Sequence, residues 1–185
     1  MWNEPDLSRY WPTGGAAETF PQFVRGLCTQ VATSPVPVPM YGFVFSRAPV
    51  GGNTASHLLE SALAGAPKCV RAVSYHAYGM TPAQIGEAAR EIRSRYGLPT
   101  IITEWGVPSQ GTATTSPAIQ ARRIVAFVAS LDALDVTLVS IYEWKDTERA
   151  ANARERSFGL VDAKGVAKPA LEQIVGYFSR RSEVR

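Results

Sequence analysis

Five stretches of the sequence repeat apolar residues at the three- and four-residue spacing of an amphipathic α-helix. Two of them begin with a hydroxyl residue followed by proline, Thr81-Pro82 and Ser116-Pro117, which is a signal for a helix N-terminus. Asn53 is a candidate cap for another, and Gly97 ends the helix that starts after Thr81. Helices are therefore predicted at about 17–33, 53–65, 81–96, 116–134 and 168–180.

Short apolar runs lie between these helices, and they are predicted to be β-strands at about 38–45, 70–78, 100–105 and 136–144. The last run is almost continuously apolar, which is typical of a strand that is buried on both faces. Because a helix separates each strand from the next, consecutive strands return in the same direction and pair in parallel. The pattern predicts an α/β fold with parallel strands alternating with helices, in a single domain over residues 1–185.

Composition narrows the classes of partner. Apolar residues make up 45% of the chain and charged residues 19%, which indicates a globular protein and excludes a disordered one. No run of eighteen apolar residues is present, so a membrane is not an expected partner. Nineteen basic residues against sixteen acidic ones leave a net charge of +3, too small an excess to indicate nucleic acid binding.

The two cysteines, Cys28 and Cys69, are widely spaced and belong to no Cys-x-x-Cys pair. Two cysteines in a chain of this length do not make a disulfide framework, so both are predicted to be small buried residues. Residues 1–15 are polar and aromatic and show no apolar segment of the kind that a signal peptide needs. The sequence leaves the cellular location open.

Polar and aromatic residues gather where the predicted strands end. At the carboxyl ends of the strands of a parallel α/β barrel, such residues form the catalytic face. A carboxylate at the end of an apolar strand is costly to desolvate, so Glu4 and Glu104 need a functional reason. A pair of carboxylates that flanks one bond is the equipment of glycoside hydrolysis. The motifs are Trp2-Asn3-Glu4-Pro5, Ser74 to Gly79, Thr103-Glu104-Trp105-Gly106 and Tyr142 to Asp146.

In this order, the motifs resemble those of (β/α)₈ glycoside hydrolases of the large retaining clan that includes cellulases, mannanases and β-xylosidases. Asn3-Glu4-Pro5 resembles the motif at the end of the clan's fourth strand, and Thr103-Glu104-Trp105-Gly106 resembles the seventh-strand motif. His76-Ala77-Tyr78 is similar to the sixth-strand motif, and Glu143-Trp144 to the eighth. The resemblance runs from the end of strand four through helix eight. It implies a partial (β/α)₈ TIM barrel, a half-barrel, since a whole barrel takes about 250 residues.

The resemblance also implies roles. Glu4 would be the acid/base and Glu104 the nucleophile, while Asn3 would bind the sugar 2-hydroxyl. His76 and Tyr78, two residues apart on one strand face, would form a polar wall that orients Glu104.

Each residue also has a structural alternative. Glu4 could be a frayed, solvated residue, Glu104 a strand-end ion pair and His76 a satisfied core histidine. Trp144 is a candidate sugar-binding platform beside Glu143 and Asp146, or else a core residue. Trp11 and Trp105 are expected to be buried rather than to contact sugar.

The expected function is a retaining β-glycosidase of the cellulase, β-glucosidase or β-xylosidase type, acting on β-linked oligo- or polysaccharides and needing no cofactor. One alternative is a non-catalytic glycan-binding or degenerate half-barrel. Another is a divalent metal held by Glu4, His76 and Glu104, although their spacing is not a metal motif. Members of the clan are often secreted.

A half-barrel also predicts assembly. Its sheet would have two open edges, one at a strand containing Trp2 and the other at 136–144. The inward faces of 40–45, 70–75 and 136–142 would lie open as a large apolar patch. A homodimer that covers these edges and faces is therefore expected, with no folded monomer at low concentration.

Overall fold

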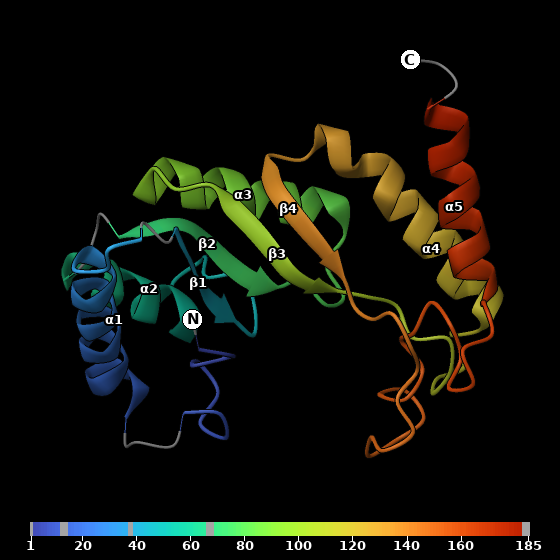
Figure 1. Cartoon of the computed structure of the whole chain (residues 1–185), viewed down its shortest axis with the longest axis horizontal. Helices are drawn as coiled ribbons and strands as arrows, with labels where there is room; N and C mark the ends of the chain where they lie inside the picture. Colours follow the sequence, from blue (N-terminus) through green and yellow to red (C-terminus); the bar gives the residue numbers. More distant parts are fainter. Residues whose placement is uncertain (1, 12–14, 37–38, 66–68, 183–185) are drawn as a thin grey trace. The chain divides into compact units, whose positions relative to one another are not determined.

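The computed structural model describes residues 2–11, 15–36, 39–65 and 69–182. Helices and strands alternate along the chain, as the hydrophobic pattern predicts (Figure 1). The elements are α1 (Ala16–Ala32), β1 (Met40–Phe45), α2 (Thr54–Gly65), β2 (Val70–His76), α3 (Pro82–Tyr96), β3 (Thr100–Trp105), α4 (Pro117–Ser130), the 3₁₀ turn η1 (Leu131–Ala133), β4 (Val136–Ile141) and α5 (Pro169–Ser182).

The strands form one four-stranded sheet in the order β1-β2-β3-β4, which is also their order in the sequence. β1 pairs with β2 in parallel, and β2 pairs with β3 in parallel. A helix connects each strand to the next, so every connection is the crossover that parallel pairing requires. This architecture confirms the predicted fold class, part of a (β/α)₈ barrel.

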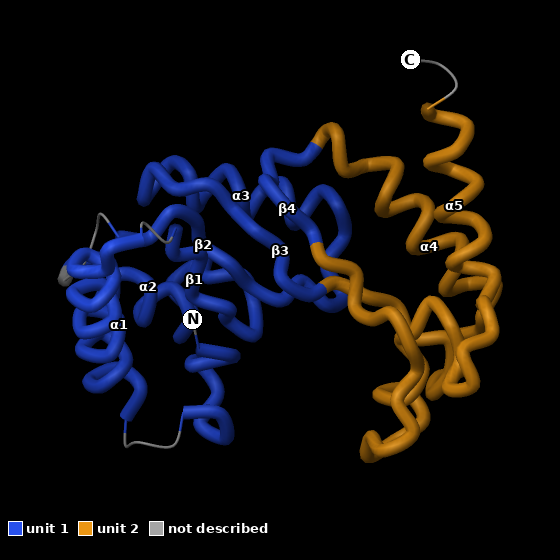
Figure 2. The backbone as a smooth tube through the Cα atoms, in the orientation of Figure 1, with its two compact units in different colours: residues 1–104, 134–139 blue, residues 105–133, 140–185 orange. Residues whose placement is uncertain are grey.

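The chain divides into two compact units, which Figure 2 colours separately. Unit 1 comprises residues 1–104 and 134–139, and unit 2 comprises residues 105–133 and 140–185. Unit 1 contains the first three helices and nearly all of the sheet, while unit 2 contains α4, η1 and α5. The single domain expected over 1–185 stays a prediction.

The predicted helix signals are confirmed at the level of individual hydrogen bonds. The Thr81 side chain accepts from the Gln84 backbone N–H, and the Gln84 side chain accepts from the Thr81 N–H, which completes a capping box. Gly97 ends α3 in the left-handed region, with φ 68°, where glycine meets no steric penalty. Ser116 caps α4, since its hydroxyl accepts a hydrogen bond from the Ile119 N–H. None of the described helices is long and apolar enough to cross a membrane.

The core of unit 1 is aromatic where α1 meets the sheet. Phe20 on α1 is fully buried and packs edge-on against Phe43 and Phe45 of β1. Trp11 packs at a right angle on Phe20, with ring centroids 5.2 Å apart, and is buried as expected. Such edge-to-face pairs add to the stabilisation that burial alone provides. This cluster fixes the segment that precedes α1 against the sheet.

The expectation of two separate buried cysteines is wrong. Cys28 on α1 and Cys69, directly before β2, form a disulfide, with a Cα–Cα distance of 5.6 Å. The two residues are 41 positions apart, and only the packing of α1 in unit 1 brings them together. A covalent link therefore joins α1 to the start of β2.

The predicted burial of the last strand is also wrong. β4 ends at Ile141, short of the predicted 144, and all of its residues are partly or fully exposed. Leu138 on this strand is 53% exposed. β4 is the last strand in the sheet order, and an edge strand has a neighbour on one side only. An apolar run can mark a strand, but it does not show what covers the strand.

The other edge of the sheet, expected at a strand containing Trp2, is formed by a different segment. Residues 2–10 form turns and bends rather than a strand, so β1 is the first strand of the sheet. The inward face expected to lie open is covered on β2, where every residue except Arg71 is buried. Ser74 of β2, for example, accepts a hydrogen bond of 3.0 Å from the Val44 N–H.

Candidate active site

The segment that carries Glu4 is a compact pair of turns. The Leu7 N–H donates to the Glu4 carbonyl, and the N–H groups of Tyr10 and Trp11 both donate to the Leu7 carbonyl. Glu4 itself has φ 47°, a left-handed conformation that is uncommon for a residue with a side chain. Such conformations persist where surrounding contacts hold them, and they cluster at functional sites.

Contacts with β1 and with Ser46, the residue directly after it, hold this segment in place. The Glu4 N–H donates to the Val44 carbonyl at 2.8 Å. The Asp6 carboxylate accepts from both the N–H and the hydroxyl of Ser46, at 2.8 and 2.6 Å. The Glu4 side chain is only 14% exposed. The alternative of a frayed, solvated Glu4 is therefore wrong.

His76 lies between the two glutamates. Its Nδ1 is 2.9 Å from Glu4 Oε1, and its Nε2 is 3.3 Å from Glu104 Oε1, although the second contact lacks the direction of a hydrogen bond. The imidazole is 1% exposed. The sheet register places His76 beside Glu104, and the Ala77 N–H donates to the Glu104 carbonyl at 2.8 Å. The ends of β2 and β3 thus place His76 beside Glu104, and the turns anchored on β1 place Glu4 at the other ring nitrogen.

Tyr78 is the second polar contact of Glu104. Its hydroxyl donates to Glu104 Oε2 at 2.8 Å, and its ring lies edge-on to His76. The Glu104 side chain remains 30% exposed, so a ligand can reach the carboxylate while Tyr78 and His76 hold it. Hydrogen bonds to a carboxylate from positioned side chains restrict its rotation and stabilise its charge.

In this arrangement one imidazole ring lies between the two carboxylates, so its protonation state affects its contacts with both. A neutral imidazole with its proton on Nδ1 donates to Glu4 and turns the Nε2 lone pair toward Glu104. An imidazolium has protons on both nitrogens and attracts both carboxylates. Nδ1 makes the directed contact, with Glu4, and its role as donor or acceptor depends on the tautomer of His76.

Tyr75, the neighbour of His76 on β2, is excluded as a proton donor. Its side chain is fully buried, and burial raises the pKa of the Tyr75 phenol well above its usual range. The phenol therefore stays neutral at ordinary pH and is a core residue.

Arg9 is a site residue that the sequence did not indicate. Its Nη2 lies 4.0 Å from Glu4 Oε2, and its guanidinium lies over the Tyr10 ring, 4.5 Å from the ring centre. The turn that follows Glu4 brings Arg9 back toward the carboxylate. A turn signal after Glu4 was available in Pro5-Asp6, but the direction in which a turn returns depends on its anchoring contacts.

The two other predicted binding residues, Asn3 and Trp144, are both exposed. Asn3 is exposed next to Glu4 in unit 1. Trp144 belongs to unit 2 and is 63% exposed, so the core alternative for this residue is wrong. Trp105 is buried as expected and stacks on Phe127, with ring centroids 3.6 Å apart.

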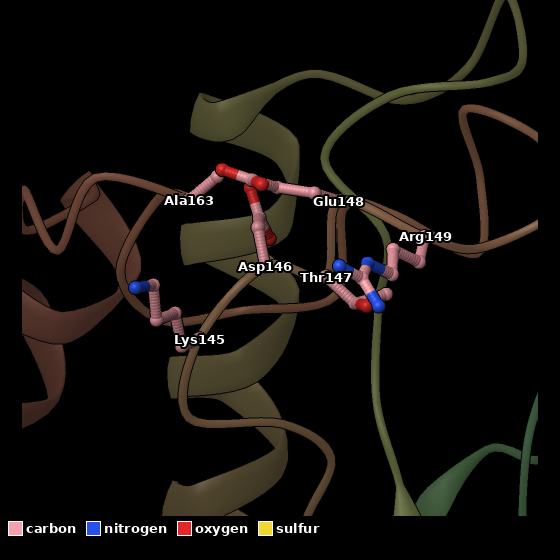
Figure 3. A pocket seen from close by; sticks show the side chains of 6 residues that line it. All are labelled: Lys145, Asp146, Thr147, Glu148, Arg149 and Ala163. Atoms are coloured by element: carbon pink, nitrogen blue, oxygen red, sulfur yellow. The ribbon is translucent and has the colours of Figure 1, made fainter.

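Unit 2 has a charged pocket in the loop after β4 (Figure 3). Asp146, one of the residues noted beside Trp144, is held there by an ion pair of 2.7 Å with the buried Lys168. In Figure 3, Lys145 and Arg149 lie on different sides of Asp146. The pocket is lined by Lys145, Asp146, Thr147, Glu148, Arg149 and Ala163.

The metal alternative has no support in this geometry. Within the described ranges, no group of three or more His, Cys, Asp or Glu side chains is arranged to hold a metal ion. Glu4 and Glu104 contact opposite nitrogens of His76, whereas ligands of one ion would have to point at a shared centre.

No family model matches the sequence, and no curated protein matches it either. Solved structures do match the fold. A GH39 enzyme from Xanthomonas axonopodis pv. citri superposes with a TM-score of 0.69 and 21% identity, over 93% of this chain and 38% of that one. A monomeric β-xylosidase from Caulobacter crescentus CB15 superposes with a TM-score of 0.63 and 17% identity, over 93% of this chain and 39% of that one. A glucosidase from Croceicoccus marinus superposes with a TM-score of 0.72 and 15% identity, over 95% of this chain and 39% of that one.

These matches confirm the predicted resemblance at the level of fold. The chain has the fold of part of the barrel of glycoside hydrolases, and it spans less than two fifths of the length of each of these three enzymes. A sequence identity this low establishes fold, whereas activity depends on the residues of the site.

Proposed function

We propose that the chain contributes the catalytic glutamates of a retaining β-glycosidase of the cellulase, β-glucosidase or β-xylosidase type. The observation that carries this proposal is the shared imidazole, since Glu4 and Glu104 contact the two nitrogens of His76. One carboxyl group at the end of a strand of a barrel fold and a second held on the same imidazole ring provide the two carboxylates that glycoside hydrolysis uses.

In this mechanism Glu104 is the nucleophile. Its carboxylate attacks the anomeric carbon and forms a glycosyl ester while the bond from that carbon to the leaving oxygen breaks. Glu4 gives its proton to the leaving oxygen and then takes a proton from the water that hydrolyses the ester. Each step moves one proton and one pair of bonding electrons between carboxyl groups and substrate, so the reaction needs no cofactor.

His76 and Tyr78 act as positioning residues. Tyr78 directs one oxygen of Glu104, and His76 fixes the carboxyl of Glu4 from its buried side. Asn3, exposed beside Glu4, is the proposed partner of the sugar 2-hydroxyl, and the exposed Trp144 offers a flat face for a sugar ring.

The proposed substrates are β-linked oligo- or polysaccharides. The support comes from two solved neighbours described as a β-xylosidase and a glucosidase. An activity screen tests this proposal with aryl β-glucoside, aryl β-xyloside, aryl β-mannoside and soluble cellulose. Wild-type protein should hydrolyse at least one of them, and Glu104→Gln should lower the rate at least 10³-fold, since the nucleophile is lost (an order-of-magnitude estimate).

The matched control for this screen is Glu87→Gln on α3. Glu87 is exposed and lies away from the described contacts of the site, so the same substitution there should leave the rate unchanged. Equal rates for wild type and Glu104→Gln would refute the assigned nucleophile.

The second candidate is a glycan-binding half-barrel without turnover. The observation in its favour is the exposed Trp144, whose flat apolar face can bind a sugar ring without any catalytic step. Saturable binding of β-linked oligosaccharides by wild-type protein, with no hydrolysis of any substrate in the screen, would select this candidate over the glycosidase.

We also propose that two copies of the chain pair through β4. The support is the exposed edge of this strand and its exposed Leu138. An edge strand presents unpaired N–H and C=O groups that a second copy satisfies about a two-fold axis.

The Cys28–Cys69 disulfide supports a place of action in an oxidising compartment, where such bonds persist.

A further inference from the structure

We propose that Arg9 and Tyr10 bind the sugar unit on the leaving-group side of the scissile bond and so determine substrate specificity. The proposal rests on the proposed role of Glu4 as the acid. It adds a binding surface, made by Arg9 and Tyr10, that the four strand-end motifs do not contain.

The two oxygens of Glu4 have different surroundings. Oε1 contacts His76, whose imidazole is 1% exposed, so a substrate cannot approach from that side. Oε2 lies on the other side and has Arg9 as its neighbour, at 4.0 Å. The carboxyl oxygen that reaches a leaving oxygen is therefore Oε2. Because the acid must lie within hydrogen-bonding distance of the leaving oxygen, the departing sugar lies on the side of Arg9.

The Arg9 guanidinium has N–H groups available to a ligand. Its side chain is 71% exposed, and within the described part of the chain it has no hydrogen-bonded acceptor. A contact of 4.0 Å with Glu4 is an ion pair that is too long for a hydrogen bond. A guanidinium carries five N–H donors in a planar fork, which suits the adjacent hydroxyl groups of a sugar.

The Tyr10 ring holds this guanidinium in place. The Arg9 guanidinium lies over the ring at 4.5 Å, a cation–π contact that limits the orientations of an exposed side chain. The carbonyl of Tyr10 accepts a hydrogen bond of 2.6 Å from the Trp2 indole, and Trp2 packs edge-on against the buried Trp11. Tyr10 and Trp2 both remain partly exposed and offer apolar ring surface beside the donors.

The backbone holds Glu4, the proposed acid, close to Arg9 and Tyr10, the proposed binding surface. Glu4 and Arg9 belong to the same pair of turns, which Asp6 ties to Ser46. The backbone of these turns therefore keeps Arg9 close to Glu4 in the chain fold.

The test compares two substrates of the same glycosidase. A β-linked oligosaccharide has a sugar as its leaving group, whereas a glycosyl fluoride with the same glycosyl unit releases fluoride and has nothing to bind at Arg9. Arg9→Ala and Tyr10→Ala should lower the ratio of kcat/KM for the oligosaccharide to kcat/KM for the fluoride about tenfold, the loss expected for charge-assisted hydrogen bonds. Arg25→Ala, an exposed arginine on α1, is the matched control and should leave the ratio unchanged.

An unchanged ratio in Arg9→Ala would overturn the proposal. If wild-type protein hydrolyses neither substrate, the proposed catalytic function fails. Calorimetry with the oligosaccharide then tests separately whether Arg9 contributes to binding. In that case Arg9→Ala should weaken binding about fivefold relative to Arg25→Ala. Equal affinities, or no binding by the wild type, would also overturn the proposal.

Discussion

The Tyr78 hydroxyl donates a hydrogen bond of 2.8 Å to Oε2 of Glu104, from the residue two positions beyond the end of β2 to the end of β3. If Glu104 is the nucleophile, this bond orients the attacking carboxylate. Tyr78→Phe removes the donor and keeps the ring, so kcat should fall about 10- to 100-fold with little change in KM, the loss expected for a hydrogen bond to a charged group. Steady-state kinetics on an aryl β-glycoside measures both constants.

Tyr41→Phe is the control for this prediction, because Tyr41 is exposed on β1 and makes no described side-chain contact. A Tyr78→Phe enzyme with wild-type kcat would show that the bond has no part in catalysis.

Glu4→Ala should affect poor leaving groups most, because only they need a proton from the acid. Hydrolysis of soluble cellulose should fall at least 10³-fold, whereas hydrolysis of a glycosyl fluoride should fall far less, on the order of tenfold. Equal losses on both substrates would exclude Glu4 as the acid.

The stereochemistry of the product tests the assignment of the pair. If Glu104 forms a glycosyl ester and Glu4 then activates water, the anomeric carbon is inverted twice and the first product is the β-anomer. The two carboxyl groups should then lie about 5–5.5 Å apart. ¹H NMR of the reaction within its first minutes distinguishes the anomers before mutarotation, and an initial α-anomer would contradict the retaining mechanism.

Reduction of the Cys28–Cys69 disulfide should destabilise unit 1. The bond closes a long loop between α1 and the start of β2, and loss of such a bond typically lowers the free energy of unfolding by about 2–4 kcal/mol. The Tm should fall by roughly 5–15 °C on addition of reductant. Cys28→Ser should show the lower Tm with and without reductant, so it serves as the control. Two free thiols in unfolded protein that has not been reduced would contradict the disulfide.

Pairing through β4 predicts a sedimentation coefficient that falls on dilution as dimers separate into monomers. Leu138→Lys places a charge on the exposed edge and should shift the protein toward monomer at every concentration, because edge charges oppose strand pairing. Val166→Lys, at an exposed apolar residue outside the sheet, is the matched control. A wild-type protein that sediments as a monomer across the whole range would exclude the dimer.

Most of the fold was predictable from the sequence because its signals are local. Thr81-Pro82 and Gly97 mark the ends of α3 through hydrogen bonds among residues that are neighbours in the chain. The apolar runs locate the strands, and the intervening helices determine their parallel pairing. The position of Glu104 at a strand end follows from the same local pattern, and so does its pairing with His76 at the end of the preceding strand.

The tertiary structure decided what depends on residues that are far apart in the chain. Glu4 meets His76 across 72 positions because Asp6 and the Glu4 backbone bind to the end of β1, and no local pattern reports that anchoring. Cys28 meets Cys69 only because α1 packs within unit 1. The exposure of β4 depends on whether another element covers it, which hydrophobicity along one strand cannot reveal. Strand identity is a property of the local sequence, whereas burial, disulfide formation and the approach of Arg9 to Glu4 arise from packing between segments or from the way a turn is anchored.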